Sequence, residues 1–150
     1  MIEGAAGIGK TVLWSFAQRA AAARGDRVLA WRASSAEREL AFAALMGLLD
    51  ADLGTTLDAL PDARRQALEL ALGRVDAGGR APEPSLVRLA VLDLLRVLAA
   101  EMPLVVGLDD ARWCDPASAA ALAFAARRLR SELVMFLLAV RAGTPESGAS

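Results

Sequence analysis

The sequence has 150 residues, enough for one domain with a sizeable core, and its 17 basic and 18 acidic residues give a formal net charge of −1. No cluster of Lys and Arg is dense enough to predict direct nucleic-acid contact by this segment. One cysteine, Cys114, and no histidine exclude an intramolecular disulfide and disfavour a structural zinc site. The longest strand-like apolar run, Leu133 to Val140, is far short of the roughly 20 residues that span a bilayer. With no charged-then-apolar leader, we expect a cytoplasmic protein without membrane contact.

The first pattern in the chain is a glycine motif that follows the last step of a strand in residues 1–3. Two glycines with four residues between them are followed by Lys and Thr. The motif consists of Gly4, Ala5, Ala6, Gly7, Ile8, Gly9, Lys10 and Thr11. Glycines let successive N–H groups turn toward an anion, and a helix that begins at Lys10 adds its positive dipole end.

This motif predicts a nucleotide-phosphate site. We expect Lys10 to reach the β and γ phosphates and the Thr11 hydroxyl to bind Mg²⁺. The alternative is a Gly/Ala-rich turn before a helix, with no ligand. The sequence contains no Asn-Lys-x-Asp guanine motif, which favours ATP over GTP.

The middle of the chain alternates between helical periodicity and one short strand. A continuous β-rich run predicts the strand, and Gly78-Gly79 with two prolines predicts a loop. In chain order we expect a helix over 10–24, a strand over 27–32, a polar connection over 34–38, helices over 40–53 and 61–72, a loop over 73–84 and a mostly buried helix over 85–100.

The last third contains two further strands. Residues 104–108 form a continuous apolar run, typical of a parallel strand covered on both faces, although Gly107 weakens it. A helix starting at Pro116 ends in basic residues near Arg130, and a strand follows over 133–140. The alternation predicts an α/β fold with a parallel sheet flanked by helices. We expect a domain over 1–143, truncated at both ends, and a polar tail over 144–150.

Charged residues at the ends of the last two strands predict the second half of the site. Asp109 is our candidate Mg²⁺ ligand, and Asp110 our candidate general base for an attacking water. The alternative is that the two aspartates begin a solvated loop. Arg141 follows the last strand, where it either stabilises charge on a γ-phosphate or is simply solvated.

Several other residues have a structural interpretation that we prefer. Asp115 is a better helix cap than ligand, because Pro116 suits the first turn after it. Trp113 is expected to anchor the loop under the site rather than to stack on adenine. Cys114 has no histidine to activate it and is expected to be inert. Trp14 and Trp31 are expected in the core.

The motifs together resemble the ATPase module of signal-transducing P-loop ATPases called STAND, in the AAA-like branch, and most closely that of large ATP-binding LuxR-type regulators. Gly4–Thr11 is similar to the family's "GxAGIGKT", and Asp109–Ser118 to its "DDAxWxDxAS". Glu39–Leu45 is similar to "ELPFAGL", and Leu60–Leu72 to the "LPxxxRxAL" helix. The resemblance covers essentially the whole chain.

This resemblance implies that the last strand lies between the glycine-motif strand and the Asp109 strand. It implies slow ATP hydrolysis coupled to oligomerisation, with DNA contacted only through a further C-terminal domain. Lys10 and Thr11 would contact phosphate and Mg²⁺, Asp109 the metal, Asp110 would be the base and Arg141 a sensor-like residue. Two alternatives stay open: a nucleotide-binding switch without turnover, and an inactive fragment of a larger regulator.

Overall fold

The computed structural model of this protein describes residues 1–4, 9–50 and 53–141. The strands are β1 (Ile2–Gly4), β2 (Arg27–Arg32), β3 (Leu104–Asp109) and β4 (Val134–Arg141). The helices are α1 (Lys10–Ala23), α2 (Ala43–Leu48), α3 (Asp62–Ala71), α4 (Pro84–Glu101) and α5 (Pro116–Arg128), with short 3₁₀ turns at Ser35–Glu37, Gly54–Ala59 and Ala111–Trp113. The predicted tail over 144–150 lies outside the described residues.

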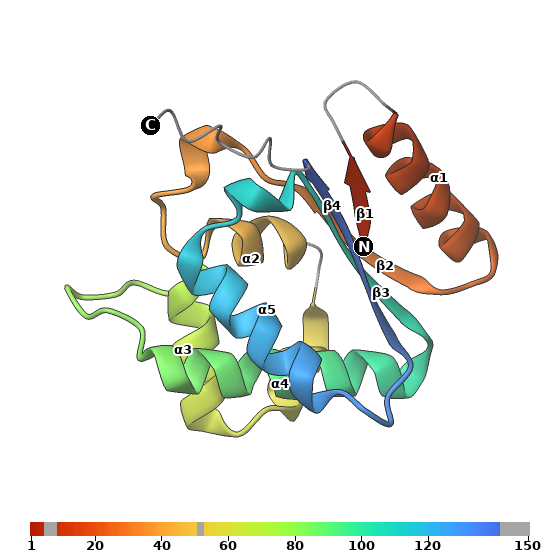
Figure 1. The fold of residues 1–150 in the computed structure, drawn as a ribbon. Helices are drawn as coiled ribbons and strands as arrows, with labels where there is room; N and C mark the ends of the chain where they lie inside the picture. Colours follow the sequence, from red (N-terminus) through yellow and green to blue (C-terminus); the bar gives the residue numbers. More distant parts are fainter. Residues whose placement is uncertain (5–8, 51–52, 142–150) are drawn as a thin grey trace, which may run out of the picture.

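The strand pairs are all parallel, and their order in the sheet is β1-β4-β3-β2. The last strand therefore lies between the strand before the glycine motif and the strand that ends at Asp109, as the family resemblance implies. Parallel neighbours need crossover connections, and each crossover here passes a helix over one face of the sheet (Figure 1). The predicted α/β fold is confirmed.

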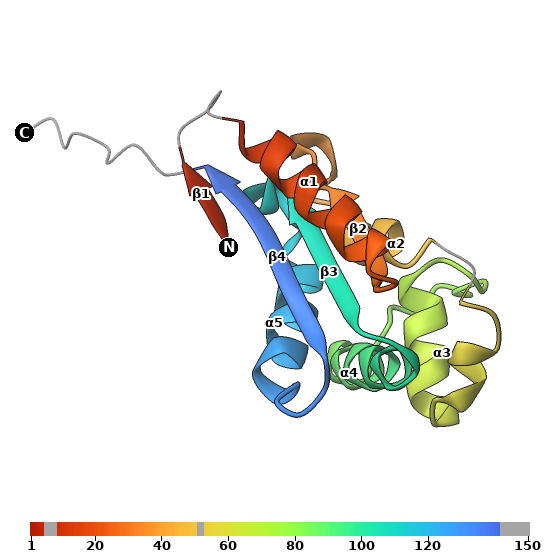
Figure 2. The same cartoon turned by 90° about the vertical axis from the view of Figure 1, so that its right-hand side faces the viewer.

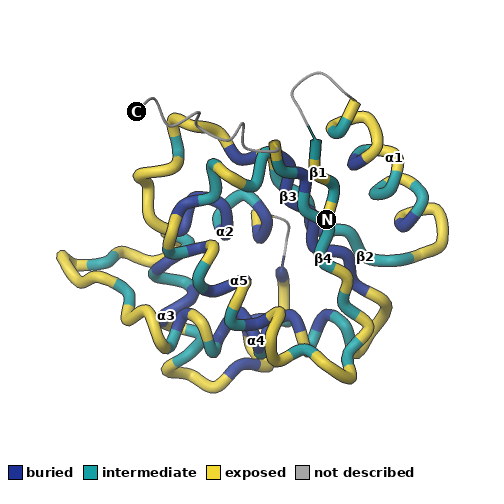
Figure 3. The backbone as a smooth tube through the Cα atoms, viewed as in Figure 1, coloured by how far each residue is buried: buried dark blue, intermediate teal, exposed yellow. Residues whose placement is uncertain are grey.

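The two faces of the sheet are covered unequally. Helix α1 lies alone on one face, while α2, α4 and α5 lie on the other, and α3 packs against α4 (Figures 1 and 2). The buried residues of the core lie in the sheet and in this second set of helices (Figure 3). The predicted, mostly buried helix is α4, whose buried positions are Val87, Ala90, Val91, Leu92, Leu94, Leu95 and Leu98. Leu and Val therefore supply most of the core.

Two tryptophans pack where a neighbouring glycine leaves room for the ring. Trp14 of α1 lies over Gly107 of β3, where an added Cβ would stand 3.2 Å from the indole. The Trp14 Nε1–H also donates to the Leu137 carbonyl at 3.3 Å. On the opposite face, a Cβ added to Gly47 of α2 would lie 2.1 Å from the Trp31 ring. Gly107, which by sequence only weakens a strand, is thus what lets Trp14 approach the sheet.

The helix predicted over residues 40–53 is wrong in its extent. Among the described residues of this segment, only Ala43–Leu48 is α-helical; Phe42 before it adopts a left-handed φ of 64°, and Leu49 ends it at φ −106°. Residues 51–52 lie outside the described residues. Most apolar side chains of the segment, from Phe42 to Leu49 and again Leu53, are buried all the same, whereas Leu40 is 55 % exposed. Apolar spacing located most of the buried side chains of this segment, but it did not predict the conformation of the backbone.

The other predicted boundaries agree with the structure to within about two residues, the usual uncertainty of element ends. Pro61 precedes α3 as its N-cap rather than as its first helical residue. Glu83 caps α4 by accepting the Leu86 N–H at 2.8 Å. Every helix within the described ranges is too short or too polar to span a bilayer.

Candidate functional site

The carboxyl ends of the parallel strands meet at one edge of the sheet, where open α/β sheets bind ligands. A cleft at this edge is lined by Gly9, Lys10, Thr11, Val12, Arg32, Asp109, Asp110 and Arg141. It brings together predicted site residues from the start of α1 and the ends of β3 and β4. Gly4 ends β1 and pairs with Arg141 in the strand register. The predicted loop residues Ala5, Ala6, Gly7 and Ile8 lie outside the described residues.

The start of α1 suits an anion. Gly9 adopts a left-handed φ of 83°, which glycine tolerates best, and its carbonyl accepts the Leu13 N–H at 3.0 Å. The first turn of α1 carries no acidic residue that would oppose a bound anion. Lys10 Nζ donates to the Gly4 carbonyl at 2.7 Å, so this lysine links the two ends of the glycine motif.

Thr11 and Asp109 are far apart in sequence, but their side chains are hydrogen-bonded. The Thr11 hydroxyl donates to Asp109 Oδ2 at 3.0 Å. Asp109 is only 2 % exposed, and its Oδ1 accepts the backbone N–H of Asp110 at 2.9 Å. A hydroxyl and a carboxylate are the hard oxygen ligands that Mg²⁺ prefers, so the residues fit this metal.

The same pair limits what kind of metal site this is. Among the described residues, no group of three or more His, Cys, Asp or Glu side chains could hold a metal ion. Mg²⁺ bound with nucleotides keeps several waters and takes one or two protein ligands beside the phosphates. The Thr11–Asp109 pair therefore fits a metal shared with a phosphate ligand, and not a metal held by protein alone.

Asp110 and Arg141 lie at the same cleft. Asp110 has a left-handed φ of 49° and ψ of 46°, a conformation that is uncommon outside glycine and better tolerated by Asp than by most residues. Arg141 ends β4 with an exposed side chain, which forms no ion pair within the described residues. Both candidate catalytic residues thus line the same cleft as Lys10.

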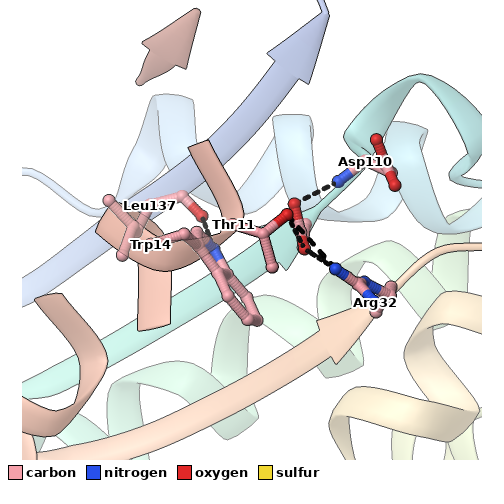
Figure 4. A network of polar contacts seen from close by, with 6 residues as sticks. Thr11, Trp14, Arg32, Asp110 and Leu137 are labelled. Carbon is pink, nitrogen blue, oxygen red and sulfur yellow. Dashed lines mark hydrogen bonds and ion pairs between the residues drawn. The ribbon is translucent and has the colours of Figure 1, made fainter. Parts of the chain in front are cut away.

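Sequence reasoning missed Arg32, the last residue of β2. Its Nε donates to Asp109 Oδ2 at 3.1 Å, and its Nη2 donates to the Thr11 hydroxyl oxygen at 3.2 Å (Figure 4). Nη2 also lies 3.0 Å from Asp109 Oδ2, as an ion pair. The available signal was an arginine at the carboxyl end of a predicted strand. It could not be used, because the sequence does not tell which strand neighbours β3.

Asp115 is a helix cap as predicted, and it does more. Its Oδ2 accepts the Ser118 N–H at 2.9 Å, which caps α5. The same carboxylate accepts the Phe42 and Ala44 N–H groups at 2.8 and 3.0 Å, which holds the start of α2. Asp115 is 1 % exposed, and both of its carboxylate oxygens accept backbone N–H groups. These contacts favour a structural role over metal binding.

Trp113 and Cys114, just before Asp115, lie in surroundings that suit packing rather than chemistry. The half-buried Trp113 ring lies beneath two guanidinium groups, with Arg112 at 4.4 Å and Arg38 at 5.8 Å from its centroid. Burial first, and the nearby Asp115 charge second, raise the pKa of the Cys114 thiol to about 11. A thiol with this pKa stays protonated near neutral pH, in line with the inert role expected for it.

A parallel sheet with crossover helices, and polar residues gathered at its carboxyl edge beside the glycine motif, is the architecture of a P-loop NTPase. Residues 1–138 match the family model of the AAA ATPase domain, and the chain belongs to that family. No curated protein and no solved structure matches the chain. Family membership supports nucleotide binding, with hydrolysis as the chemistry to be tested.

Proposed function

We propose that this chain binds ATP with Mg²⁺ and hydrolyses it slowly. The observation that carries the proposal is the hydrogen bond between Thr11 and Asp109. It joins the end of the glycine motif to the end of a buried strand, which is where a metal shared with phosphates needs its protein ligands. The membership of the AAA ATPase domain family supports the same chemistry.

The binding residues act through charge and geometry. The motif from Gly4 to Thr11 offers backbone N–H groups to the phosphates, with Ala5, Ala6, Gly7 and Ile8 included in the proposal. Lys10 exchanges its bond to the Gly4 carbonyl for the phosphate oxygens. Thr11 and Asp109 are the Mg²⁺ ligands, and the bound metal would supply positive charge next to the phosphates.

Two residues are proposed for the chemical step. Asp110 accepts a proton from, or orients, the water that attacks the γ-phosphate. Arg141 stabilises the negative charge that develops on the transferred group, as donors do in other phosphoryl transfers. Both side chains line the cleft that Lys10 and Thr11 also line, which supports these roles.

We further propose that the domain is the nucleotide switch of a signal-transducing, LuxR-type transcriptional regulator of the STAND class. Support comes from two family-like segments that touch: the Phe42 N–H in Glu39–Leu45 bonds to Asp115 in Asp109–Ser118. In this proposal the domain works in the cytoplasm, forms homo-oligomers, and does not contact DNA itself.

A thermal melt with and without excess Mg-ATP tests binding. Ligand at about 100 times its Kd adds about 2.7 kcal/mol, which predicts a rise in Tm of about 5–10 °C. The rise should vanish in Lys10→Ala and persist in Arg19→Ala, which removes an exposed positive charge from the same helix. A cooperative melt whose Tm does not change with Mg-ATP would contradict the proposed binding and favour an inactive domain.

Phosphate release then separates hydrolysis from binding alone. Steady release that is abolished by Lys10→Ala supports the ATPase. Release of unchanged rate in Lys10→Ala would show that the measured activity does not come from this site. Tight nucleotide retention without release would select the alternative, a switch without turnover.

A further inference from the structure

The geometry at the carboxyl edge places a positive side chain on the two residues proposed to bind the metal. Arg32 donates once to Asp109 Oδ2, at 3.1 Å, and once to the Thr11 hydroxyl oxygen, at 3.2 Å, and its Nη2 forms an ion pair with the same Oδ2 at 3.0 Å. The Asp110 N–H occupies the other carboxylate oxygen, Oδ1. The guanidinium therefore contacts the two oxygen atoms, Asp109 Oδ2 and the Thr11 hydroxyl oxygen, that would bind a metal ion (Figure 4).

Arg32 and a metal cannot share these atoms. A metal ion binds through oxygen lone pairs, and an Arg N–H bond occupies the lone pair to which it points. Asp109 Oδ2 already accepts from the Thr11 hydroxyl and from Arg32 Nε, and Arg32 Nη2 pairs with it at 3.0 Å. A second cation at this position would also be repelled by the guanidinium charge, most strongly where water is excluded. Binding of one cation requires release of the other.

The burial of the two partners shows which one is able to leave. The Arg32 side chain is 60 % exposed, so water can solvate the guanidinium once it is released. The Asp109 side chain is 2 % exposed, and a carboxylate this buried is costly without a cation beside it. Asp109 thus needs one positive partner at all times, whereas Arg32 does not need Asp109.

We propose that Arg32 is an internal cation that holds Thr11 and Asp109 together in the nucleotide-free protein and is displaced when Mg²⁺ arrives with nucleotide. The inference rests on the proposed function, which makes Thr11 and Asp109 the metal ligands. Arg32 is then a positioning residue. It keeps the ligand pair assembled and makes entry of a bare divalent cation unfavourable.

The first test measures divalent-cation binding without nucleotide, by titrating Mn²⁺ in an electron paramagnetic resonance experiment. A charged hydrogen bond contributes about 1.5–3 kcal/mol, so Arg32→Gln should bind Mn²⁺ about tenfold or more tightly than the wild type. Arg32→Lys, which keeps the charge, should stay close to the wild type. Arg141→Gln is the matched control, since it removes an equal charge from the same cleft.

Two results of this titration overturn the proposal. One is Mn²⁺ affinity that does not rise in Arg32→Gln although the variant melts cooperatively. The other is an equal rise in Arg32→Gln and Arg141→Gln, which would mean that only the overall charge of the cleft matters. If Arg32→Gln fails to fold, Arg32→Met, which keeps the aliphatic stem, takes its place in the same comparison.

A second titration, with ADP in the presence of Mg²⁺ or of EDTA, separates this proposal from the proposed function. Mg-ADP should bind Arg32→Gln at least as tightly as it binds the wild type. Weaker Mg-ADP binding would make Arg32 a phosphate ligand and overturn the displacement. If the wild type binds no ADP at all, the proposed function fails, and the Mn²⁺ titration still decides whether Arg32 occupies a cation site.

Discussion

Two buried aspartates of the same segment show how the partners of a carboxylate decide its use. Asp109 is 2 % exposed and Asp115 is 1 % exposed, so burial does not distinguish them. Asp115 accepts three backbone N–H groups, from Phe42, Ala44 and Ser118. Asp109 accepts instead from two side chains at the cleft, Thr11 and Arg32, and from one backbone N–H.

The difference lies in whether the donors are able to leave. Backbone N–H groups move only if their helices move, so Asp115 is locked in a structural role. A hydroxyl rotates and an exposed guanidinium can be solvated, so the partners of Asp109 are exchangeable. From this contrast we expect Asp115 to matter for stability and, under the proposed function, Asp109 to matter for ligand binding, and the following predictions test it.

The largest expected effect on stability is that of Asp115→Ala. Each buried donor left without a partner costs about 1–3 kcal/mol, and this change leaves several, so we expect a loss of about 4 kcal/mol. Urea denaturation measures it. Ser118→Ala, which orphans only the Leu45 N–H, is the smaller control, at about 1–2 kcal/mol. A loss in Asp115→Ala no greater than in Ser118→Ala would break the contrast.

A second prediction asks whether α2 is held rigidly enough for its N–H groups to be fixed donors. Gly47→Ala places a Cβ 2.1 Å from the Trp31 ring, a clash that only a shift of α2 or of the ring can relieve. Overpacking of this kind typically costs 1–3 kcal/mol, and we expect about 3 kcal/mol by urea denaturation. Gly107→Ala meets Trp14 at 3.2 Å and should cost less. Equal costs would indicate that the contact between α2 and Trp31 yields easily and that α2 is not held as rigidly as the contrast requires.

A third prediction applies the same substitution to the other aspartate. Asp109→Ala should lower the free energy of unfolding by only about 1 kcal/mol. The Thr11 hydroxyl and the Arg32 guanidinium lose their partner, but water can replace it. Under the proposed function, it should also abolish the gain in ADP affinity that Mg²⁺ provides, measured by calorimetric titration with and without the metal. A stability loss as large as that of Asp115→Ala would show that Asp109 is structural.

The smallest effect uses Cys114 as a reporter of the Asp115 charge. Burial, and then Asp115, raise the thiol pKa from 9.0 to about 11. Because the folded pKa is raised, the stability contribution is complete below about pH 9 and is lost as the pH rises toward 11. Asp115→Asn should lower the pKa and speed alkylation by iodoacetamide at pH 9, provided the variant stays folded. An unchanged rate in a folded variant would leave burial as the sole cause.

Much of the fold could be predicted because it depends on local patterns. The glycine motif, the capped helix after Asp115 and the continuous apolar run before Asp109 indicate their own structure, since turn chemistry, caps and burial act over a few residues. The segment over 40–53 could not be predicted in this way. Its backbone is held by a hydrogen bond to Asp115 and by packing on Trp31. Local periodicity carries no information about these long-range contacts.

The sequence by itself determined where the glycine motif lies and which charged residues follow predicted strands. It therefore indicated as candidates Lys10, Thr11, Asp109, Asp110 and Arg141. Their roles remain predictions, but the structure places all of them at one cleft. Only the tertiary structure decided that β2 lies beside β3, which pairs Arg32 with Asp109 in register. The physical reason is that strand order depends on how helices cover the faces of the sheet, a long-range packing choice that brings distant charges together.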